Sequence, residues 1–122
     1  MTNPFKDQKT FMKACDQTVG ILNQEQFDLY RTLIAEEVKE LDEAINVDDK
    51  VEKLDALLDI MVVTLGAIHS LGVDEENAWK EVISSNMSKI DAKTGKVLKR
   101  EDGKVIKPDT FKPPRLDNYF LD

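Results

Sequence analysis

The sequence has little cysteine and little histidine, and each shortage excludes a class of protein. Cys15 is the single cysteine, so no disulfide can form within the chain, and we expect a reducing, cytoplasmic location. His69 is the single histidine, and the residue three positions before it is Gly66. A ferritin-like di-iron bundle needs Glu-x-x-His pairs, so that class is excluded.

Long apolar runs and aromatic residues are also scarce. No run reaches the roughly 18 apolar residues that a membrane span needs, and the polar start of the chain lacks a secretory pattern. We therefore expect no membrane partner. A composition of 41% hydrophobic but only 7% aromatic residues favours a helical domain rich in Leu, Val and Ile. At 122 residues the chain is expected to be one domain with a modest core.

The net charge of −7 is unevenly distributed along the chain. Residues 1–88 hold 8 basic and 18 acidic side chains, whereas residues 89–122 hold 9 basic and 6 acidic ones. An acidic body argues against a long nucleic acid as partner, because such binding depends on neutralising phosphates. The basic end is either a solvated tail or a surface for a small polyanion.

Capping residues and apolar spacing predict four helices. We expect the first, capped by Asn3, from about residue 4 to 19, and the second, capped by Asn23, to about residue 45. The third follows a cap at Asp48 or Asp49 and ends near residue 71, and the fourth runs from Asp74 to about 87. Short connections between helices favour a four-helix bundle. The expected fold is therefore all-α, with a helical core over about 4–90.

The C-terminal part of the chain differs in character. Two short stretches, residues 96–100 and 104–107, flank the turn Glu101-Asp102-Gly103, whose glycine favours a tight reversal, and this pattern predicts a small β-hairpin. Pro108, Pro113 and Pro114 then predict an extended segment. An isolated hairpin is marginal in water, so we expect the arm over about 91–122 to pack on the helices or on another subunit.

Acidic residues form two groups on the second and third predicted helices. Carboxylates three or four residues apart share a helix face and repel one another by a few tenths of a kcal/mol. Crowding of this kind calls for a cation, and ligands that are all oxygen favour Mg²⁺, with Mn²⁺ as the alternative. The first group consists of Glu36, Glu37 and Glu40, and the second of Glu52, Asp55 and Asp59.

Asp59 is the most informative of these residues. From Ala56 to Ile68 nearly every position is apolar, with Asp59 and Thr64 as the exceptions. A helix that is apolar all round is expected to be buried, and a buried carboxylate is costly unless it is paired or binds a metal. No Lys or Arg lies in this run. A metal site is therefore favoured over the alternative of solvated surface charge.

Together these motifs resemble a known superfamily. The order EExxE, a short spacer, ExxD and an apolar helix resembles the all-α nucleoside triphosphate pyrophosphohydrolases, which include MazG-like enzymes. Three stretches are similar to the phosphoribosyl-ATP pyrophosphohydrolase branch: residues 55–59, 72–74 and 85–89. The resemblance covers about residues 25–115. It implies hydrolysis of the α–β phosphoanhydride of a nucleoside triphosphate to a nucleoside monophosphate and pyrophosphate, by a homodimer or homotetramer.

The resemblance also implies roles for individual residues. Glu36, Glu37 and Glu40 are similar to the first ligand group, and Glu36 and Glu37 are the expected catalytic residues. The second ligand group stays open, because Glu52-x-x-Asp55 fits the motif while Asp59 occupies the position just before the apolar helix. The expected metal ligands are Glu36, Glu40, Glu52, Asp55 and Asp59, and the expected phosphate contacts are Asn86, Lys89 and Arg115.

Two alternatives to the enzyme remain open on the sequence. One is a non-catalytic helical oligomer that binds nucleotide or metal in a regulatory role, since a fold does not fix a function. The other is a metal-buffering bundle. The sequence does not specify the base of a nucleotide substrate. The first helix offers Phe5, Phe11, Met12 and Gln17 as base-selecting residues, but core packing is the more common role for such side chains.

Overall fold

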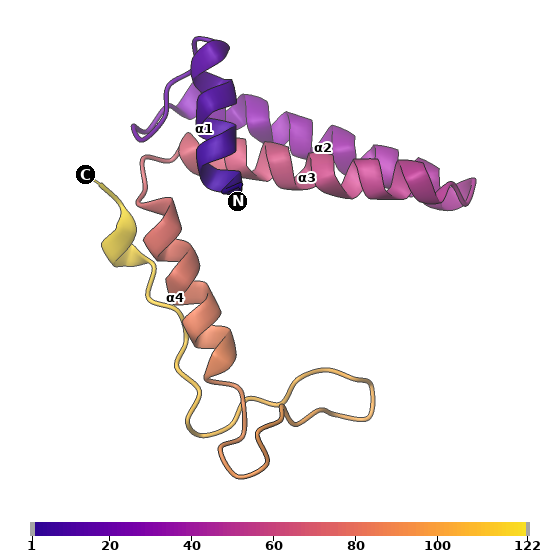
Figure 1. The fold of residues 1–122 in the computed structure, drawn as a ribbon, viewed down its shortest axis with the longest axis vertical. Helices are drawn as coiled ribbons and strands as arrows, with labels where there is room; N and C mark the ends of the chain where they lie inside the picture. The colour runs from indigo at the N-terminus through magenta and orange to yellow at the C-terminus, as the bar shows by residue number, and fades with distance from the viewer. Residues whose placement is uncertain (1, 122) are drawn as a thin grey trace. The chain divides into compact units, whose positions relative to one another are not determined.

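The computed structural model describes residues 2–121, and its regular secondary structure over that range is helical, without a strand. Its helices are α1 (Pro4–Ala14), α2 (Gln24–Asn46), α3 (Lys50–His69) and α4 (Glu75–Met87), followed by a short 3-10 turn at Asp117–Tyr119 (Figure 1). The predicted all-α class with four helices is therefore confirmed. Within the described residues, the helices are too short or too polar to cross a membrane.

The chain divides into two compact units. One contains residues 2–75 with 120–121, and the other contains residues 76–119. The first unit holds α1, α2 and α3, and most of α4 belongs to the second. The four-helix bundle and the single domain over residues 1–122 stay predictions.

Side-chain caps start the first three helices at the predicted positions. The Asn3 side chain accepts hydrogen bonds from two backbone N–H groups in the first turn of α1. Asn23 accepts one from the backbone N–H of Gln26 at 3.0 Å. Of the two candidates for α3, Asp49 is the cap, and Asp48 takes a positive φ of 54° in the turn before it. Each cap satisfies backbone donors that the helix itself leaves without partners.

Helix α1 ends earlier than predicted. It stops at Ala14, not near residue 19, because Asp16 adopts the left-handed backbone conformation with φ of 59°. The Gln17 N–H then donates to the Met12 carbonyl at 2.9 Å, which closes the helix end in a Schellman-type motif. Glycine usually holds this position, so an aspartate gave no strong stop signal in the sequence.

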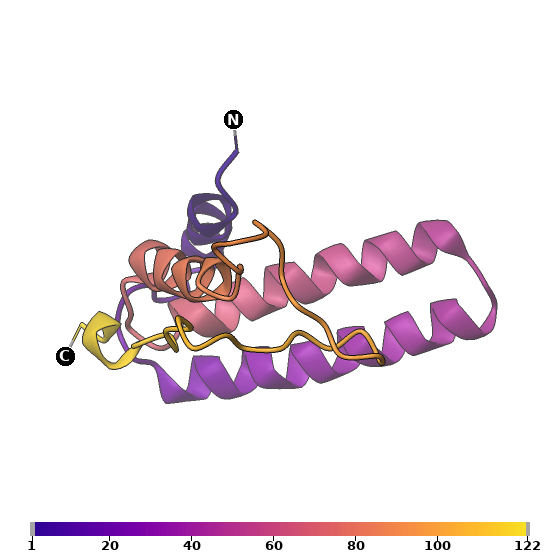
Figure 2. The same ribbon diagram turned by 90° about the horizontal axis from the view of Figure 1, so that it is seen from below.

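Helices α2 and α3 lie side by side and antiparallel, and α1 packs against α3 near one end of the pair (Figures 1 and 2). The core of this unit contains Met12, Tyr30 and Ala67, one from each helix. Gly66 lets the Tyr30 ring lie directly against the α3 backbone, where a side chain would occupy the same space. Partly buried residues packed around this core are Val19, Phe27, Leu33, Ile34 and Val63.

A buried polar network fixes the loop between α1 and α2 to the end of α3. Gln26 is 8% exposed, and its side chain exchanges hydrogen bonds with the backbone of Thr18 at 3.0 and 2.7 Å. The same amide donates to the Ser70 hydroxyl at 2.9 Å, and Ser70 donates to the Gly66 carbonyl at 2.8 Å. These bonds satisfy buried polar groups, which would be costly to bury alone.

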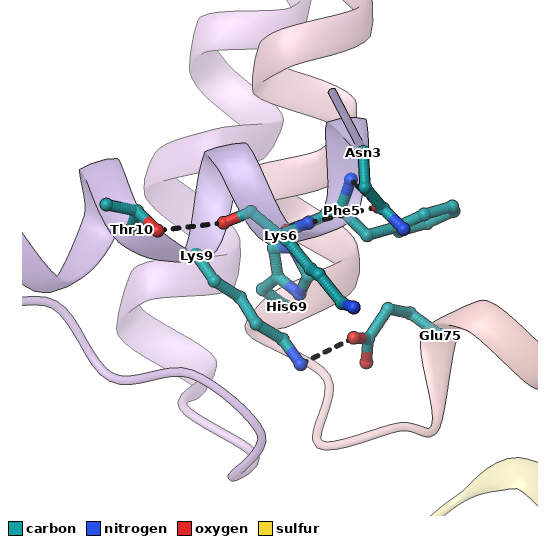
Figure 3. A network of polar contacts seen from close by, with 7 residues as sticks. All are labelled: Asn3, Phe5, Lys6, Lys9, Thr10, His69 and Glu75. Atoms are coloured by element: carbon teal, nitrogen blue, oxygen red, sulfur yellow. Dashed lines mark hydrogen bonds and ion pairs between the residues drawn. The ribbon is translucent and has the colours of Figure 1, made fainter. Parts of the chain in front are cut away.

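His69 joins the end of α3 to α1 (Figure 3). Its Nε2 lies 2.9 Å from the Phe5 carbonyl oxygen, which only accepts, so Nε2 carries the proton. Beside it, Lys9 and Glu75 form an ion pair of 2.6 Å. The His69 side chain is 1% exposed, and burial lowers its pKa because water is excluded from the charged ring. The single histidine is therefore a packing residue at a helix end.

The second unit contains α4 and the C-terminal arm, and the predicted β-hairpin is wrong. The described arm has isolated bridges at Ile90–Val97 and Lys99–Val105 but no strand. The chain does reverse, because the Ile106 N–H donates to the Leu98 carbonyl at 2.8 Å. Most residues of the arm are exposed, so the two short segments have little apolar surface to bury and do not extend into a ladder.

The extended segment after the reversal runs back along α4 (Figure 1). The Lys112 N–H donates to the Ser88 hydroxyl at 2.9 Å, and the Arg115 N–H donates to the Glu81 carboxylate at 3.1 Å. These two bonds attach the segment to the end and then to the middle of α4. The prolines of this stretch are compatible with that path, because it is extended and makes few backbone hydrogen bonds.

Replacing Gly66 with alanine is expected to destabilise the protein. The added methyl group would overlap the Tyr30 ring, and overpacking costs about 1–3 kcal/mol. That cost exceeds the roughly 1 kcal/mol that alanine gains over glycine in a helix. Urea denaturation followed by circular dichroism measures the difference. Thr64→Ala, at an exposed position of α3, is the control and should change stability by less than about 0.5 kcal/mol. Equal stabilities for Gly66→Ala and wild type would contradict the proposed packing.

Candidate metal centre

The pairing of α2 and α3 brings three carboxylates together. Glu37 and Glu40 lie one turn apart on α2, and Asp59 faces them from α3. One carboxylate oxygen from each residue lies within 4.8 Å of the other two. Glu37 and Asp59 are half-buried, and Glu40 is exposed. We refer to these three residues as the carboxylate cluster.

The cluster has too much negative charge for its surroundings. Burial raises the pKa of Glu37, and the adjacent Glu40 and the charges of Asp59 and Asp55 raise it further. Burial also raises the pKa of Asp59, followed by the charges of Asp55 and Glu40. Among the described residues the ion pairs lie elsewhere in the fold. The carboxylates therefore repel one another, and within the described residues none of them forms an ion pair with a cationic side chain.

One atom of the cluster is left without a partner. Glu37 Oε2 is buried, and no hydrogen-bond donor from the described residues reaches it. A buried oxygen of this kind needs an explanation, such as a bound ion, a bound water or a catalytic role. Hard divalent cations take several oxygen ligands at short distances, and three converging carboxylate oxygens supply such ligands. The residues present therefore fit a divalent cation.

The other residues predicted as ligands lie around the cluster. Asp55 is one turn before Asp59 on α3, and its charge acts on both Glu37 and Asp59. Glu52 lies one turn further toward the α2–α3 loop, where it lines a groove of about 380 Å³ together with Glu40. Glu36 is exposed and outside the carboxylate cluster. The division of these residues into ligands and neighbours stays a prediction.

Helix α3 is less buried than the sequence predicts. Asp59 is half-buried, but the apolar residues on one side of the same helix are largely exposed. Leu54 is 59% exposed and Met61 is 54% exposed. The prediction of a helix buried all round is therefore wrong for this chain alone, because α1 covers only the C-terminal part of that face.

The predicted phosphate contacts belong to the second unit. Lys89 lies just after α4, and its ammonium donates to the Asn86 side-chain oxygen at 3.1 Å. Arg115 is exposed and lies on the extended segment. Sequence patterns did not single out Phe111, which holds the ammonium groups of Lys89 and Lys107 near its ring. The available signal was one aromatic residue within a basic, proline-containing stretch.

These features define a class of protein. An all-α chain with a carboxylate cluster on two antiparallel helices is typical of the all-α nucleoside triphosphate pyrophosphohydrolases. The family model described as phosphoribosyl-ATP pyrophosphohydrolase matches residues 8–86. The chain belongs to this family, and the predicted superfamily is confirmed. It is a pyrophosphohydrolase, a hydrolase that acts on acid anhydrides. No curated protein matches the chain.

The charge of the cluster predicts how stability depends on pH in the absence of metal. The pKa values of Glu37 and Asp59 are higher in the folded than in the unfolded protein. At pH values between the unfolded and the folded pKa, the folded state therefore holds more protons than the unfolded state. The free energy of unfolding contributed by these groups therefore falls as pH rises above the ordinary carboxylate range. Glu37→Gln should remove part of this fall and stabilise the protein at pH 7 in EDTA.

Urea denaturation between pH 4.5 and 7.5 tests this prediction. The exposed Glu36→Gln is the control, because it removes the same charge outside the cluster. His69 also affects how stability depends on pH, but it is present in wild type, Glu37→Gln and Glu36→Gln alike. Its contribution to the free energy of unfolding therefore cancels when the three proteins are compared. A Glu37→Gln protein that is less stable than wild type at pH 7 in EDTA would contradict the uncompensated cluster.

Proposed function

We propose that the protein is a Mg²⁺-dependent nucleoside triphosphate pyrophosphohydrolase that releases a nucleoside monophosphate and pyrophosphate. The observation that carries this proposal is the convergence of Glu37, Glu40 and Asp59, none of which forms an ion pair with a cationic side chain among residues 2–121. The family supplies the reaction class, hydrolysis of a phosphoanhydride. The choice of a nucleoside triphosphate rests on the resemblance of the EExxE and ExxD motifs to that superfamily.

The cation would be held by oxygen ligands from both helices. Glu40 and Asp59 provide ligands from the carboxylate cluster, and Asp55 adds negative charge beside them. A set of oxygen ligands favours Mg²⁺, with Mn²⁺ as the alternative. When bound, such an ion neutralises phosphate charge and lowers the pKa of a coordinated water.

Glu37 is the proposed general base. Its Oε2 is buried and has no hydrogen-bond donor among the described residues, so this oxygen is available to accept a proton from the attacking water. The direction of its pKa shift suits this role, because a base whose pKa lies closer to the working pH is more effective. Glu36 lies beside it and is the weaker candidate, since it is exposed.

Binding of the phosphates is proposed for residues of the second unit. Lys89 carries an ammonium and Asn86 an amide, and the two side chains already contact each other. Arg115 adds a guanidinium, which binds phosphate oxygens in pairs. These three roles rest on the resemblance and on the chemistry of the side chains.

The exposed apolar side of α3 supports an oligomer. A continuous apolar helix face of this kind is costly to leave in water. We propose that a second copy of the chain covers it, giving a homodimer or a homotetramer in which α2 and α3 contribute to a four-helix bundle. The residues of this face with more than half of their area exposed are Val51, Leu54 and Met61, with Leu58 at 50%.

The activity is tested with a panel of ribo- and deoxynucleoside triphosphates and Mg²⁺, following pyrophosphate release. At least one nucleotide should be hydrolysed to its monophosphate. Asp59→Asn should lower kcat/KM by at least about 100-fold, which is the effect of removing an electrostatic group at a reacting centre. Glu43→Gln, an exposed acidic position near the groove, should stay within about threefold of wild type.

Failure to hydrolyse any nucleotide would contradict the enzyme proposal. Nucleotide or Mg²⁺ binding without turnover would then favour the regulatory oligomer. Metal binding that nucleotide does not strengthen would favour a metal buffer. A kcat/KM of Asp59→Asn equal to wild type would place the reaction outside the carboxylate cluster.

The oligomer is tested by a charge at the centre of the apolar face. Leu58→Lys should shift the molar mass measured by light scattering toward that of the monomer, because burying an unpaired ammonium in the interface is unfavourable. Thr32→Lys, at an exposed position of α2, adds the same charge and should leave the mass unchanged. A wild-type protein that is monomeric at micromolar concentration would contradict the proposal.

A further inference from the structure

A second cluster of charge lies around the ring of Phe111, in the second unit. The Lys89 ammonium lies 5.7 Å from the ring centroid, and the Lys107 ammonium lies 5.0 Å from it. Both distances are within the range of cation–π attraction. Phe111 is half-buried. One ring therefore gathers two like charges from segments well separated in the sequence.

Local hydrogen bonds hold this arrangement. The Phe111 N–H donates to the Pro108 carbonyl at 3.0 Å, which closes a turn just after the second lysine. The next N–H, from Lys112, donates to the Ser88 hydroxyl at 2.9 Å. Ser88 immediately precedes Lys89, so this bond brings the turn to the end of α4. The contact of both lysines with the ring thus follows from the path of the backbone.

The two ammonium groups lack a carboxylate partner among the described residues. The ion pairs formed there involve Lys9, Lys53 and Arg100 instead. Lys89 donates to the Asn86 side-chain oxygen at 3.1 Å, and that bond leaves the Asn86 NH₂ group to donate elsewhere. Two ammonium groups and an amide therefore offer several donors and two positive charges on a small surface.

We propose that Lys107, together with Lys89 and Asn86, binds the phosphate groups of the nucleotide or the pyrophosphate product. The inference deepens the proposed function and rests on it. Lys107 is the new residue, and Phe111 positions it. A polyphosphate fits better than a single carboxylate, because it spreads several negative charges over oxygens that both ammonium groups reach together.

The test measures the dissociation constant of inorganic pyrophosphate with Mg²⁺ by isothermal titration calorimetry on the full chain. Lys107→Met keeps an apolar stem against the ring and removes the charge. We expect the dissociation constant to rise about tenfold, as for the loss of one charge-assisted hydrogen bond. Lys107→Arg should restore it to within about threefold of wild type. Lys104→Met, an exposed lysine of the same arm, removes the same charge and should change it less than twofold.

The kinetic counterpart uses a nucleotide that the panel shows to be hydrolysed. Lys107→Met should raise KM more than it lowers kcat, because a phosphate contact acts mainly through binding. Circular dichroism of each variant excludes unfolding as the cause. If Lys107→Met and Lys104→Met bind pyrophosphate equally well, or if wild type does not bind it, the inference is wrong.

The two proposals fail separately. If wild type hydrolyses nucleotides while Lys107→Met binds pyrophosphate as wild type does, only the role of Lys107 is overturned. If no nucleotide is hydrolysed but Lys107→Met still weakens pyrophosphate binding, the phosphate site stands and the proposed reaction is overturned.

Discussion

The first unit depends on one constraint: the packing of α2 against α3 forces carboxylates of like charge together. Tyr30 lies against the α3 backbone at Gly66, and this close approach sets how the two helices face each other. Further along the same pair, Glu37 and Glu40 then meet Asp59. The apolar packing stabilises the pair, whereas the charge repulsion opposes it. A bound cation would turn the repulsion into attraction, which couples ligand binding to the stability of the helix pair.

The remaining features of this unit hold the helix pair in place at its other end. Met12 brings α1 into the core, and His69 bonds the end of α3 to the backbone of α1. Gln26 and Ser70 complete the attachment of the loop between α1 and α2. This end is well packed and its buried polar groups are largely satisfied. The uncompensated charge is therefore confined to the part of the pair near the carboxylate cluster, where an ion and a substrate are proposed to bind.

Much of this structure could be predicted from the sequence, because local signals determine it. Asn3, Asn23 and Asp49 cap helices as predicted, since capping depends only on nearby backbone groups. The end of α1 was missed because Asp16 replaces the expected glycine. The hairpin prediction was wrong because the two short stretches in residues 96–107 have little apolar surface to pack against. For the site, helical spacing placed Glu37 near Glu40, but only the pairing of α2 with α3 shows that Asp59, not Glu52, joins them.

The most direct test of cation binding at the carboxylate cluster is the effect of Mg²⁺ on the stability of the wild-type protein without nucleotide. Urea denaturation at pH 7 is measured over a series of Mg²⁺ concentrations, with KCl added to keep the ionic strength constant. We expect the free energy of unfolding to rise with Mg²⁺ and to approach a logarithmic dependence on its concentration, because the cation binds only the folded state. A free energy of unfolding that does not change with Mg²⁺ at constant ionic strength would contradict it.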